Sequence, residues 1–366
     1  MTYVFEAPGS YVQGRDVSAA IGSHAESLGD HALVLGDDVV LSLVADPVEE
    51  GFRDRGIETT VEEFGEESSE EEVARIAGIG ADAGADIVVG AGGGKALDTA
   101  KAVAIENDVA MVSMPTIAST DAPTSALSVI YTPEGEFEEY WFHERHPDLV
   151  LVDTALVATA PTRFFTSGIG DALATWFEAD AAYRSSAENM VGGRSTRAAH
   201  RLGRLCYETL REHAVSAVHA VENDAVTESV EAVTEANTLL SGLGFESGGL
   251  AAAHAVHNGL TQLEETHHAT HGEKVNVGTL TQLVLEGHDD AFVEELIEFS
   301  LAADLPVTLS GIGIDDPESA DLGSVAEAAC AGGETIHNEP FEVTPAMVED
   351  ALRTADALGR DASEAA

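Results

Sequence analysis

The chain has 366 residues, enough for two globular domains, and 44% of them are hydrophobic, but its formal net charge is −49. Aspartate and glutamate recur along almost the whole chain, and lysine occurs only at positions 95, 101 and 274. Such an acidic surface repels phosphate backbones, which argues against a nucleic-acid partner. No apolar run approaches the roughly eighteen residues of a membrane helix.

The even acidic coat, together with a normal apolar content, predicts a protein adapted to concentrated salt. At molar ionic strength the Debye length falls to about 3 Å, and the repulsion between surface carboxylates is screened. The amino terminus shows no basic stretch followed by an apolar run, so we expect a cytoplasmic protein. Two cysteines, Cys206 and Cys330, exclude a disulfide framework and a cysteine-based zinc site.

The first 160 residues alternate between short apolar runs and helical patterns. We predict strands over 31–37, 57–64, 86–90 and 109–115, with helices between them that include 69–83 and a segment from the glycines near 92 to about 107. This alternation predicts a Rossmann-like parallel sheet covered by helices on both faces. After it, LSVIYTPEGEFEEYWF predicts a hairpin that turns at 133–135.

Beyond residue 160 the sequence predicts helices only. Amphipathic stretches cover 162–184, 194–213, 227–243, 248–263 and 289–303. The expected fold is therefore α/β, with a Rossmann-like N-terminal domain over 1–160 that binds NAD. An all-helical domain over 161–366 follows and is expected to bind metal and substrate.

A glycine-rich motif, GAGGGKALDTAK, runs from Gly90 to Lys101 directly after a predicted strand and opens a helix. Glycines let a pyrophosphate approach the backbone, and the helix amino terminus offers unpaired N–H groups. A tight turn without a ligand is the alternative. Asp37, which ends the first predicted strand, could accept hydrogen bonds from an adenosine ribose and would favour NAD over NADP. It could equally be a loop carboxylate.

The next motif, MPTIASTDAPTSALSVIYT, spans 114–132 and is rich in hydroxyl groups. Thr116, Ser119 and Ser125 can donate hydrogen bonds to a cofactor, and Asp121 could bind a substrate hydroxyl. A polar surface loop would have a similar composition.

Five histidines lie between residues 254 and 271: His254, His257, His267, His268 and His271. A single histidine on an apolar helix is usually a packed core residue, but this density favours a metal site. Catalytic sites for zinc or ferrous iron commonly use two histidines and a carboxylate. Asp171, within the apolar helical segment FFTSGIGDALATWFEA, is the candidate carboxylate because an unpaired charge there would be costly.

Taken together, GAGGGKALDTAK, PTIASTDAPTSALSVIYT, GIGDALATWFEA, LSGLGFESGGLAAAHAVHNGLT and HGEKV resemble the glycerol dehydrogenase branch of the iron-containing alcohol dehydrogenase family. The resemblance implies a metal bound by Asp171, His254 and His271 and a glycerol contact from Asp121. It also implies NAD contacts from Asp37, Gly94, Lys95, Thr116, Ser119, Ser125, Leu127 and Tyr131. To these we add three more residues of the glycine motif as expected NAD contacts: Gly92, Gly93 and Asp98. His257 is expected beside the site or in the core, and His267 and His268 in an exposed loop.

The implied activity is the reversible, NAD-dependent oxidation of glycerol at C2 to dihydroxyacetone, with hydride transfer to the nicotinamide. Zinc is the expected metal, although ferrous iron or manganese suits the same donors. The alternatives are a glycerol-1-phosphate dehydrogenase, a dehydroquinate-synthase-like lyase and a non-catalytic NAD sensor. The dehydrogenase of glycerol 1-phosphate and the lyase would each need cationic side chains to bind a substrate phosphate. Near the candidate metal site the sequence offers only Lys274 and Arg163. The partner is expected to be a small polyol, and the chain is expected to form a homo-oligomer of undetermined size.

Overall fold

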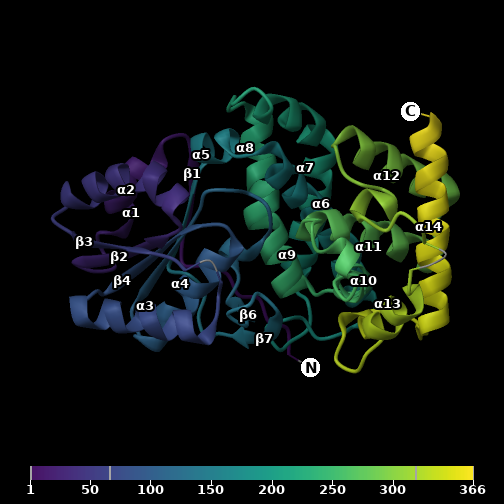
Figure 1. Cartoon of the computed structure of the whole chain (residues 1–366), viewed down its shortest axis with the longest axis horizontal. Coiled ribbons are helices and arrows are strands. Elements are labelled where there is room, and N and C mark those ends of the chain that lie inside the picture. The colour runs from purple at the N-terminus through teal and green to yellow at the C-terminus, as the bar shows by residue number, and fades with distance from the viewer. Residues whose placement is uncertain (1, 66, 318–319, 366) are drawn as a thin grey trace. The chain divides into compact units, whose positions relative to one another are not determined.

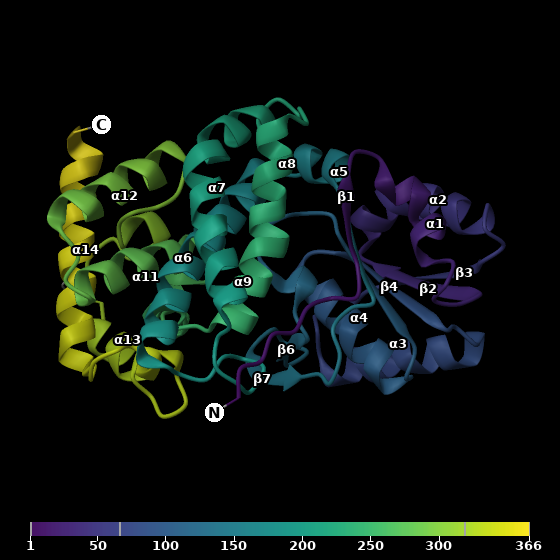
Figure 2. The same cartoon turned by 180° about the vertical axis from the view of Figure 1, so that it is seen from behind.

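The computed structural model describes residues 2–65, 67–317 and 320–365 and divides into two compact units. The α/β unit comprises Ala7–Pro161 and Ala220–Gly242. The helical unit comprises Met1–Glu6, Thr162–His219 and Leu243–Ala366. Figure 1 shows the chain coloured from one end to the other, and Figure 2 shows it from behind.

The two units are not continuous in sequence, which differs from the predicted division at residue 160. The segment 220–242 contains α8 (Glu228–Glu235), and it belongs to the α/β unit because Glu231 anchors it there. One carboxylate oxygen of Glu231 accepts a hydrogen bond from Gln13, and the other accepts one from Thr154, both at 2.7 Å. Such contacts between distant segments have no local sequence signal.

The α/β unit is built on a six-stranded sheet in the order β1-β8-β5-β4-β2-β3, and every pairing in it is parallel. Its strands are β1 (Tyr11–Gly14), β2 (His31–Gly36), β3 (Glu58–Glu63), β4 (Ile87–Gly92), β5 (Ala110–Pro115) and β8 (Leu149–Asp153). Its helices, besides α8, are α1 (Ile21–Ala25), α2 (Asp38–Arg53), α3 (Glu70–Ala83), α4 (Gly94–Glu106) and α5 (Thr154–Thr159). The predicted hairpin is the antiparallel pair of β6 (Leu127–Tyr131) and β7 (Phe137–Phe142).

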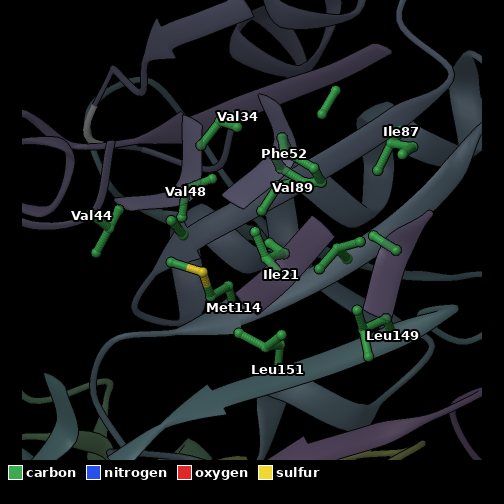
Figure 3. Close-up of a cluster of buried hydrophobic side chains, with 14 of the residues drawn as sticks. Ile21, Val34, Val44, Val48, Phe52, Ile87, Val89, Met114, Leu149 and Leu151 are labelled. Carbon is green, nitrogen blue, oxygen red and sulfur yellow. The ribbon is translucent and has the colours of Figure 1, made fainter. Parts of the chain in front are cut away.

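Both faces of this sheet are buried, as the near-continuous apolar strands predicted. On one face Val34 and Val89 pack against Phe52 and other side chains of α1 and α2, as Figure 3 shows. On the opposite face Leu33 and Val88 pack against side chains of α3 and α4. Alternate residues of each strand thus enter different cores.

The sequence analysis did not identify two of the strands, β1 and β8. β1 has four residues, all only partly buried, so no apolar run marks it. β8 is fully buried, but its five residues lead directly into α5 without a turn signal between them. Both strands lie at the β1 end of the sheet, away from β2 and β4.

The helical unit carries no named strand among its described residues. Its helices are α6 (Thr162–Ser185), α7 (Arg197–Val221), α9 (Ser241–Gly248), α10 (Ala252–Leu260), α11 (His271–Leu285), α12 (Asp290–Ala302), α13 (Leu322–Ala329) and α14 (Pro345–Ala365), of which α7 and α9 begin or end across the unit boundary. No helix among the described residues has the length and apolar character needed to cross a membrane.

Two predicted helices are interrupted in the structure. The stretch 227–243 forms α8, then a π-helical turn over Ala236–Leu240, then α9. In the stretch 248–263, Gly248 still belongs to α9, residues 249–251 form no regular secondary structure, and α10 begins only at Ala252. Gly249 causes this break, because its φ of +115° lies outside helical geometry and a Cβ atom there would come within 2.8 Å of Ala182 Cβ.

Candidate active site

Asp171, His254 and His271 converge on one point of the helical unit. Oδ1 of Asp171 lies 3.3 Å from Nε2 of His254 and 3.1 Å from Nε2 of His271. A set of donor atoms from these three residues, one from each, lies within 4.8 Å of one another. The aspartate is 1% exposed, whereas the two histidines are only partly covered, so the cluster is open on the histidine side.

Two glycines bring the helices of the cluster close together. Gly170 precedes Asp171 on α6, and Gly272 follows His271 on α11. A Cβ atom at Gly272 would overlap the carbonyl oxygen of Ser167, and one at Gly170 would overlap the carbonyl oxygen of Gly272. The absence of side chains at both positions is what lets the ligands reach each other.

The start of α11, where His271 is the first residue, is held by a capping box. Thr270 accepts a hydrogen bond from the Glu273 backbone N–H, and the Glu273 side chain accepts one from the Thr270 N–H. Arg163 of α6 donates two hydrogen bonds of 2.7 Å to the Glu273 carboxylate and a third to the His268 carbonyl. The orientation of His271 is therefore set by charged contacts with α6.

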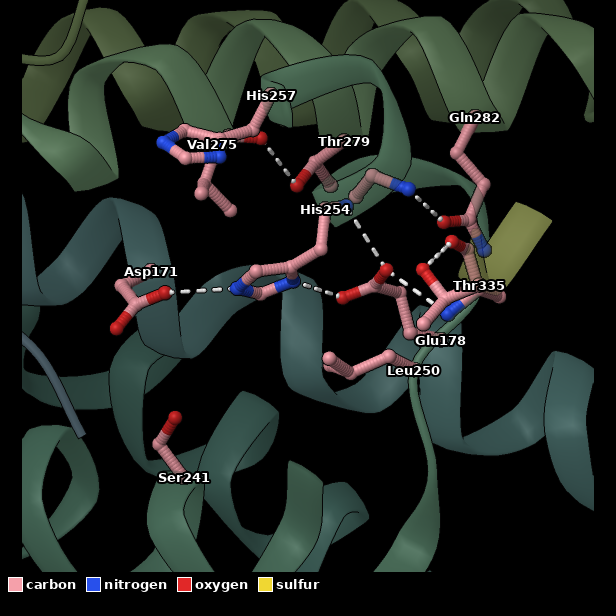
Figure 4. Close-up of polar contacts among 12 residues, drawn as sticks. Asp171, Glu178, Ser241, Leu250, His254, His257, Val275, Thr279, Gln282 and Thr335 are labelled. Atoms are coloured by element: carbon pink, nitrogen blue, oxygen red, sulfur yellow. Dashed lines mark hydrogen bonds and ion pairs between the residues drawn. The ribbon is translucent and has the colours of Figure 1, made fainter. Parts of the chain in front are cut away.

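His254 lies between two carboxylates of α6, as Figure 4 shows. Its Nδ1 is 2.5 Å from Oε2 of Glu178, and its Nε2 faces Asp171. Oε1 of Glu178 already accepts the backbone N–H groups of Ala251 and His254, each at 2.9 Å. An ionised carboxylate only accepts hydrogen bonds, so Nδ1–H of His254 donates to Glu178. The lone pair on Nε2 then points to Oδ1 of Asp171, which is also an acceptor.

That arrangement fits a bound cation. Lone pairs of one carboxylate and two imidazoles facing each other at 3.1–3.3 Å repel unless a proton or a metal ion lies between them. Burial would raise the pKa of Asp171, but the two histidines hold it well below its usual value. Burial would lower the pKa of His254, but Glu178 and Asp171 raise it well above the usual range. In the metal-free protein a proton can thus occupy the place that two histidines and a carboxylate would give to zinc, iron or manganese.

The other histidines lie where the sequence suggested. His257 is 9% exposed, and its ring centroid is 4.3 Å from that of His271, with Nδ1 near the Asn258 side chain. Burial lowers the pKa of His257 well below its ordinary value. His267 and His268 are exposed. None of the three joins the cluster of metal donors found among the described residues.

In the α/β unit, the glycine motif lies at the switch point of the sheet. β2 and β4 are neighbours, with Leu35 opposite Gly90, and the helices that follow them pack on opposite faces. Gly92 has a φ of +145°, and Gly93 is the N-cap of α4 without a side-chain cap. The first N–H groups of α4 thus stand open at the place where parallel α/β sheets bind ligands, which fits a pyrophosphate.

Asp37 lies beside this turn, at the end of β2. It is the N-cap of α2, and its Oδ1 accepts the N–H of Val40 at 2.8 Å. A helix cap explains its presence without a cofactor. Its other carboxylate oxygen accepts no hydrogen bond from the described residues, so the cap and a ribose contact are compatible.

The hydroxyl-rich loop packs over the glycine turn. The Thr116 N–H donates to the Gly92 carbonyl at 3.1 Å, and a Cβ atom at Gly93 would touch Ile117. Thr116 is buried and Ser119 is half-buried. The structure therefore brings the predicted cofactor residue Thr116 next to Gly92, at the start of the glycine turn.

Lys101 anchors the end of this loop from inside α4. Its side chain is 3% exposed, and its ammonium group donates to the carbonyl oxygens of Ala122 and Leu127, with Ser125 Oγ at 3.4 Å. Two of the predicted cofactor residues, Ser125 and Leu127, are thus positioned by a buried lysine. The sequence analysis did not select Lys101, although it is one of only three lysines in the chain.

Asp98 has a role different from the predicted cofactor contact. Its carboxylate pairs with Lys101 at 2.8 Å and accepts the N–H of Val129 at 3.0 Å. Burial raises the pKa of Asp98, although Lys101 acts in the opposite direction. With the side chain buried in this way, we assign Asp98 to the packing of β6 against α4 rather than to NAD.

The remaining predicted residues of this unit lie around the same loop. Lys95 forms an ion pair with Glu67 at 2.6 Å, and its Nζ stands 5.1 Å from the ring centroid of Tyr131. Burial raises the pKa of Tyr131 to about 12, which keeps the phenol neutral. Asp121 is partly exposed, and its Oδ2 accepts a hydrogen bond of 2.8 Å from Ser241.

Glu178 is the other residue that sequence reasoning missed. It lies seven residues after Asp171, about two helical turns, so both carboxylates project from the same side of α6. In a chain with 66 acidic residues its spacing alone carried no signal. A buried position within the apolar segment ATWFEA is the feature that could have drawn attention to it.

A parallel sheet with an open glycine turn at its switch point, joined to helices that carry two histidines and an aspartate, places the protein among the metal-dependent dehydrogenases. The sequence pattern of the family described as iron-containing alcohol dehydrogenase matches residues 8–154. The chain belongs to the iron-containing alcohol dehydrogenase family.

Several relatives match over nearly the whole length. A glycolaldehyde reductase of Halobacterium salinarum is 66% identical over 98% of this chain and 99% of its own. A glycerol dehydrogenase of Escherichia coli is 51% identical over 98% of both chains. The crystal structure of glycerol dehydrogenase from Schizosaccharomyces pombe, 38% identical, superposes with a TM-score of 0.95 over 99% of this chain and 92% of that one. The protein is accordingly an oxidoreductase of the kind that acts on small polyols.

Proposed function

We propose that the protein catalyses the reversible, NAD-dependent oxidation of glycerol at C2 to dihydroxyacetone, with a divalent metal held by Asp171, His254 and His271. The proposal rests on the convergence of three acceptor atoms, one of which is a buried carboxylate oxygen. Their lone pairs repel one another unless a proton or a cation lies between them. A metal ion held by these three residues would keep part of its coordination shell open for a substrate such as a vicinal diol.

The reaction transfers two electrons and balances as glycerol and NAD⁺ giving dihydroxyacetone, NADH and a proton. When bound, the metal supplies a Lewis acid that lowers the pKa of a substrate hydroxyl. We propose that Asp121, held by Ser241, accepts a hydrogen bond from the diol and orients it. The uncapped start of α4 binds the pyrophosphate, and Asp37 binds the ribose and disfavours a 2′-phosphate.

A second candidate, reduction of glycolaldehyde, is favoured by the 66% identity to the glycolaldehyde reductase of Halobacterium salinarum. The two reactions share their chemistry, because each substrate carries a hydroxyl group next to the carbon that exchanges hydride. Zinc is the proposed metal in both, and ferrous iron or manganese would suit the same donors.

Phosphorylated substrates are disfavoured by the state of the two candidate cations. Arg163 is engaged in a double hydrogen bond with Glu273. Lys274 is buried, and this burial lowers the pKa of its ammonium group. We therefore place glycerol-1-phosphate dehydrogenase and the dehydroquinate-synthase-like lyase below the two polyol reactions.

The test compares kcat/KM in roughly molar KCl, where the acidic surface is screened. Glycerol and glycerol 1-phosphate are assayed with NAD and with NADP, and dihydroxyacetone and glycolaldehyde with NADH. The proposal expects glycerol and dihydroxyacetone to be turned over with NAD in preference to NADP. A kcat/KM for glycolaldehyde well above that for dihydroxyacetone would select the second candidate, and activity confined to glycerol 1-phosphate would contradict both.

A further inference from the structure

Glu178 is the strongest unassigned feature next to the metal-donor cluster. Its side chain is fully buried, and both of its oxygens are used: Oε1 by the N–H groups of Ala251 and His254, and Oε2 by Nδ1 of His254. One carboxylate thus contacts both the imidazole and the backbone of the same histidine.

The first turn of α10, whose N-cap lies three residues before His254, depends on side chains from other elements. The N-cap residue is Ala251, which has no side-chain acceptor of its own. Glu178 accepts two N–H groups of this turn, and Gln282 of α11 accepts the N–H of Ala253 at 2.9 Å. Thr335 donates to the Ala251 carbonyl at 2.7 Å, and Figure 4 shows these residues around the turn.

Asp171 and Glu178 flank His254 from one helix. Asp171 faces Nε2, and Glu178 faces Nδ1. Nδ1–H of His254 donates a hydrogen bond to Glu178. The lone pair of the neutral imidazole is therefore on Nε2, the atom that faces the other metal-donor atoms. A hydrogen bond at the second nitrogen sets both the tautomer and the direction of a metal-binding histidine.

We propose that Glu178 is a positioning residue, which fixes the tautomer and orientation of His254 and thereby sets the affinity of the site for its metal. The proposal rests on the metal site of the proposed function. It adds that a residue outside the ligand set determines whether His254 can act as a ligand.

The decisive variant is Glu178→Gln. The amide oxygen can still accept the two backbone N–H groups, so the start of α10 stays capped. The amide NH₂ group, however, donates to Nδ1 of His254 and moves the imidazole hydrogen to Nε2, where it blocks the metal. We expect the affinity for zinc to fall about 10- to 100-fold.

Thr335→Val is the matched control. It removes a hydrogen bond to the same turn and leaves the contact between His254 and Glu178 in place. We expect it to lower the melting temperature and to change zinc affinity less than about threefold. A second variant, Glu178→Asp, keeps the charge but withdraws the carboxylate by one methylene, and its zinc affinity should also fall.

Zinc affinity is measured on the full chain in high salt by competition with a chromophoric chelator. The visible spectrum of the cobalt(II) form reports the ligand geometry. Weaker zinc binding and an altered cobalt spectrum in Glu178→Gln support the proposal. Wild-type zinc affinity in whichever Glu178 variant folds overturns it.

Two reference proteins separate this inference from the proposed function. A wild-type chain that takes up no zinc, or a His254→Ala variant that retains it, refutes the metal site and with it both proposals. Zinc binding that is lost in His254→Ala but unchanged in Glu178→Gln overturns the role of Glu178 alone.

Discussion

The close approach of α6 and α11 leads to a direct prediction for Gly272→Ala. A Cβ atom at this position would overlap the Ser167 carbonyl oxygen and lie 2.6 Å from its carbon. An ordinary contact between carbon atoms is about 3.5 Å, so the helices must separate by roughly 1 Å. Overpacking of this kind typically costs about 1–3 kcal/mol, which is roughly 2–12 °C in melting temperature for a unit of this size.

The same shift would act on the metal ligands, because His271 and Gly272 are adjacent and Asp171 lies on the opposing helix. The assay is differential scanning calorimetry in high salt together with metal content per chain. Gly78→Ala is the control, because Gly78 is an exposed residue of α3 with no atom within 4 Å of the added Cβ, and alanine there should stabilise by about 1 kcal/mol. A Gly272→Ala protein with wild-type melting temperature and full metal content would refute the reasoning.

Three further predictions follow from the ligands, the surface and a buried carboxyl group. His254→Ala and Asp171→Ala should each lose bound metal and at least about 100-fold in turnover while keeping the circular dichroism spectrum; wild-type turnover in either would contradict the metal assignment. Lowering the salt concentration should unfold the chain, because the net charge of −49 is then unscreened, and an unchanged circular dichroism signal would speak against this. Burial and Glu286 raise the pKa of Glu339 from its usual 4.5 to about 9, so the folded protein holds a proton that the unfolded chain releases. The contribution of Glu339 to stability is complete below about pH 4.5 and is lost as the pH rises through about 9. The melting temperature of Glu339→Gln should therefore exceed that of the wild type by a margin that grows between about pH 6 and 9. A difference in melting temperature that stays constant over this range would contradict the assignment.

The sequence predicted the parts of the fold that local patterns encode. Buried strands such as β2 and β4 show as apolar runs, and the glycine turn shows where a helix follows a strand, so these elements were located within a few residues. The family was also accessible, because several long motifs occur in order. The break between α9 and α10 was not predicted, since it depends on the positive φ of Gly249 and on the lack of room beside Ala182 for a Cβ atom at that position.

In the candidate site, too, residues with a local signal were predicted, and residues that depend on contacts between distant segments were not. Asp171 could be selected because it lies in an apolar segment, and the family resemblance singled out His254 and His271 among the five histidines; the structure brings the donor atoms of all three together. Glu178, Lys101 and Asp98 act through contacts between separate segments, and in so acidic a chain their identities gave no indication of which would be buried. The contacts of NAD and of the polyol, and the expected homo-oligomer, stay predictions.

The central claim is that one metal ion, held by two histidines and an aspartate, is needed for polyol oxidation. It is tested most directly by NAD reduction with glycerol in high salt, measured before chelator treatment, after it, and after zinc is returned. The account predicts that the chelator abolishes the reaction, that about one zinc per chain restores it, and that His254→Ala is not restored. Glycerol-dependent NAD reduction that persists at full rate in the metal-free protein would contradict it.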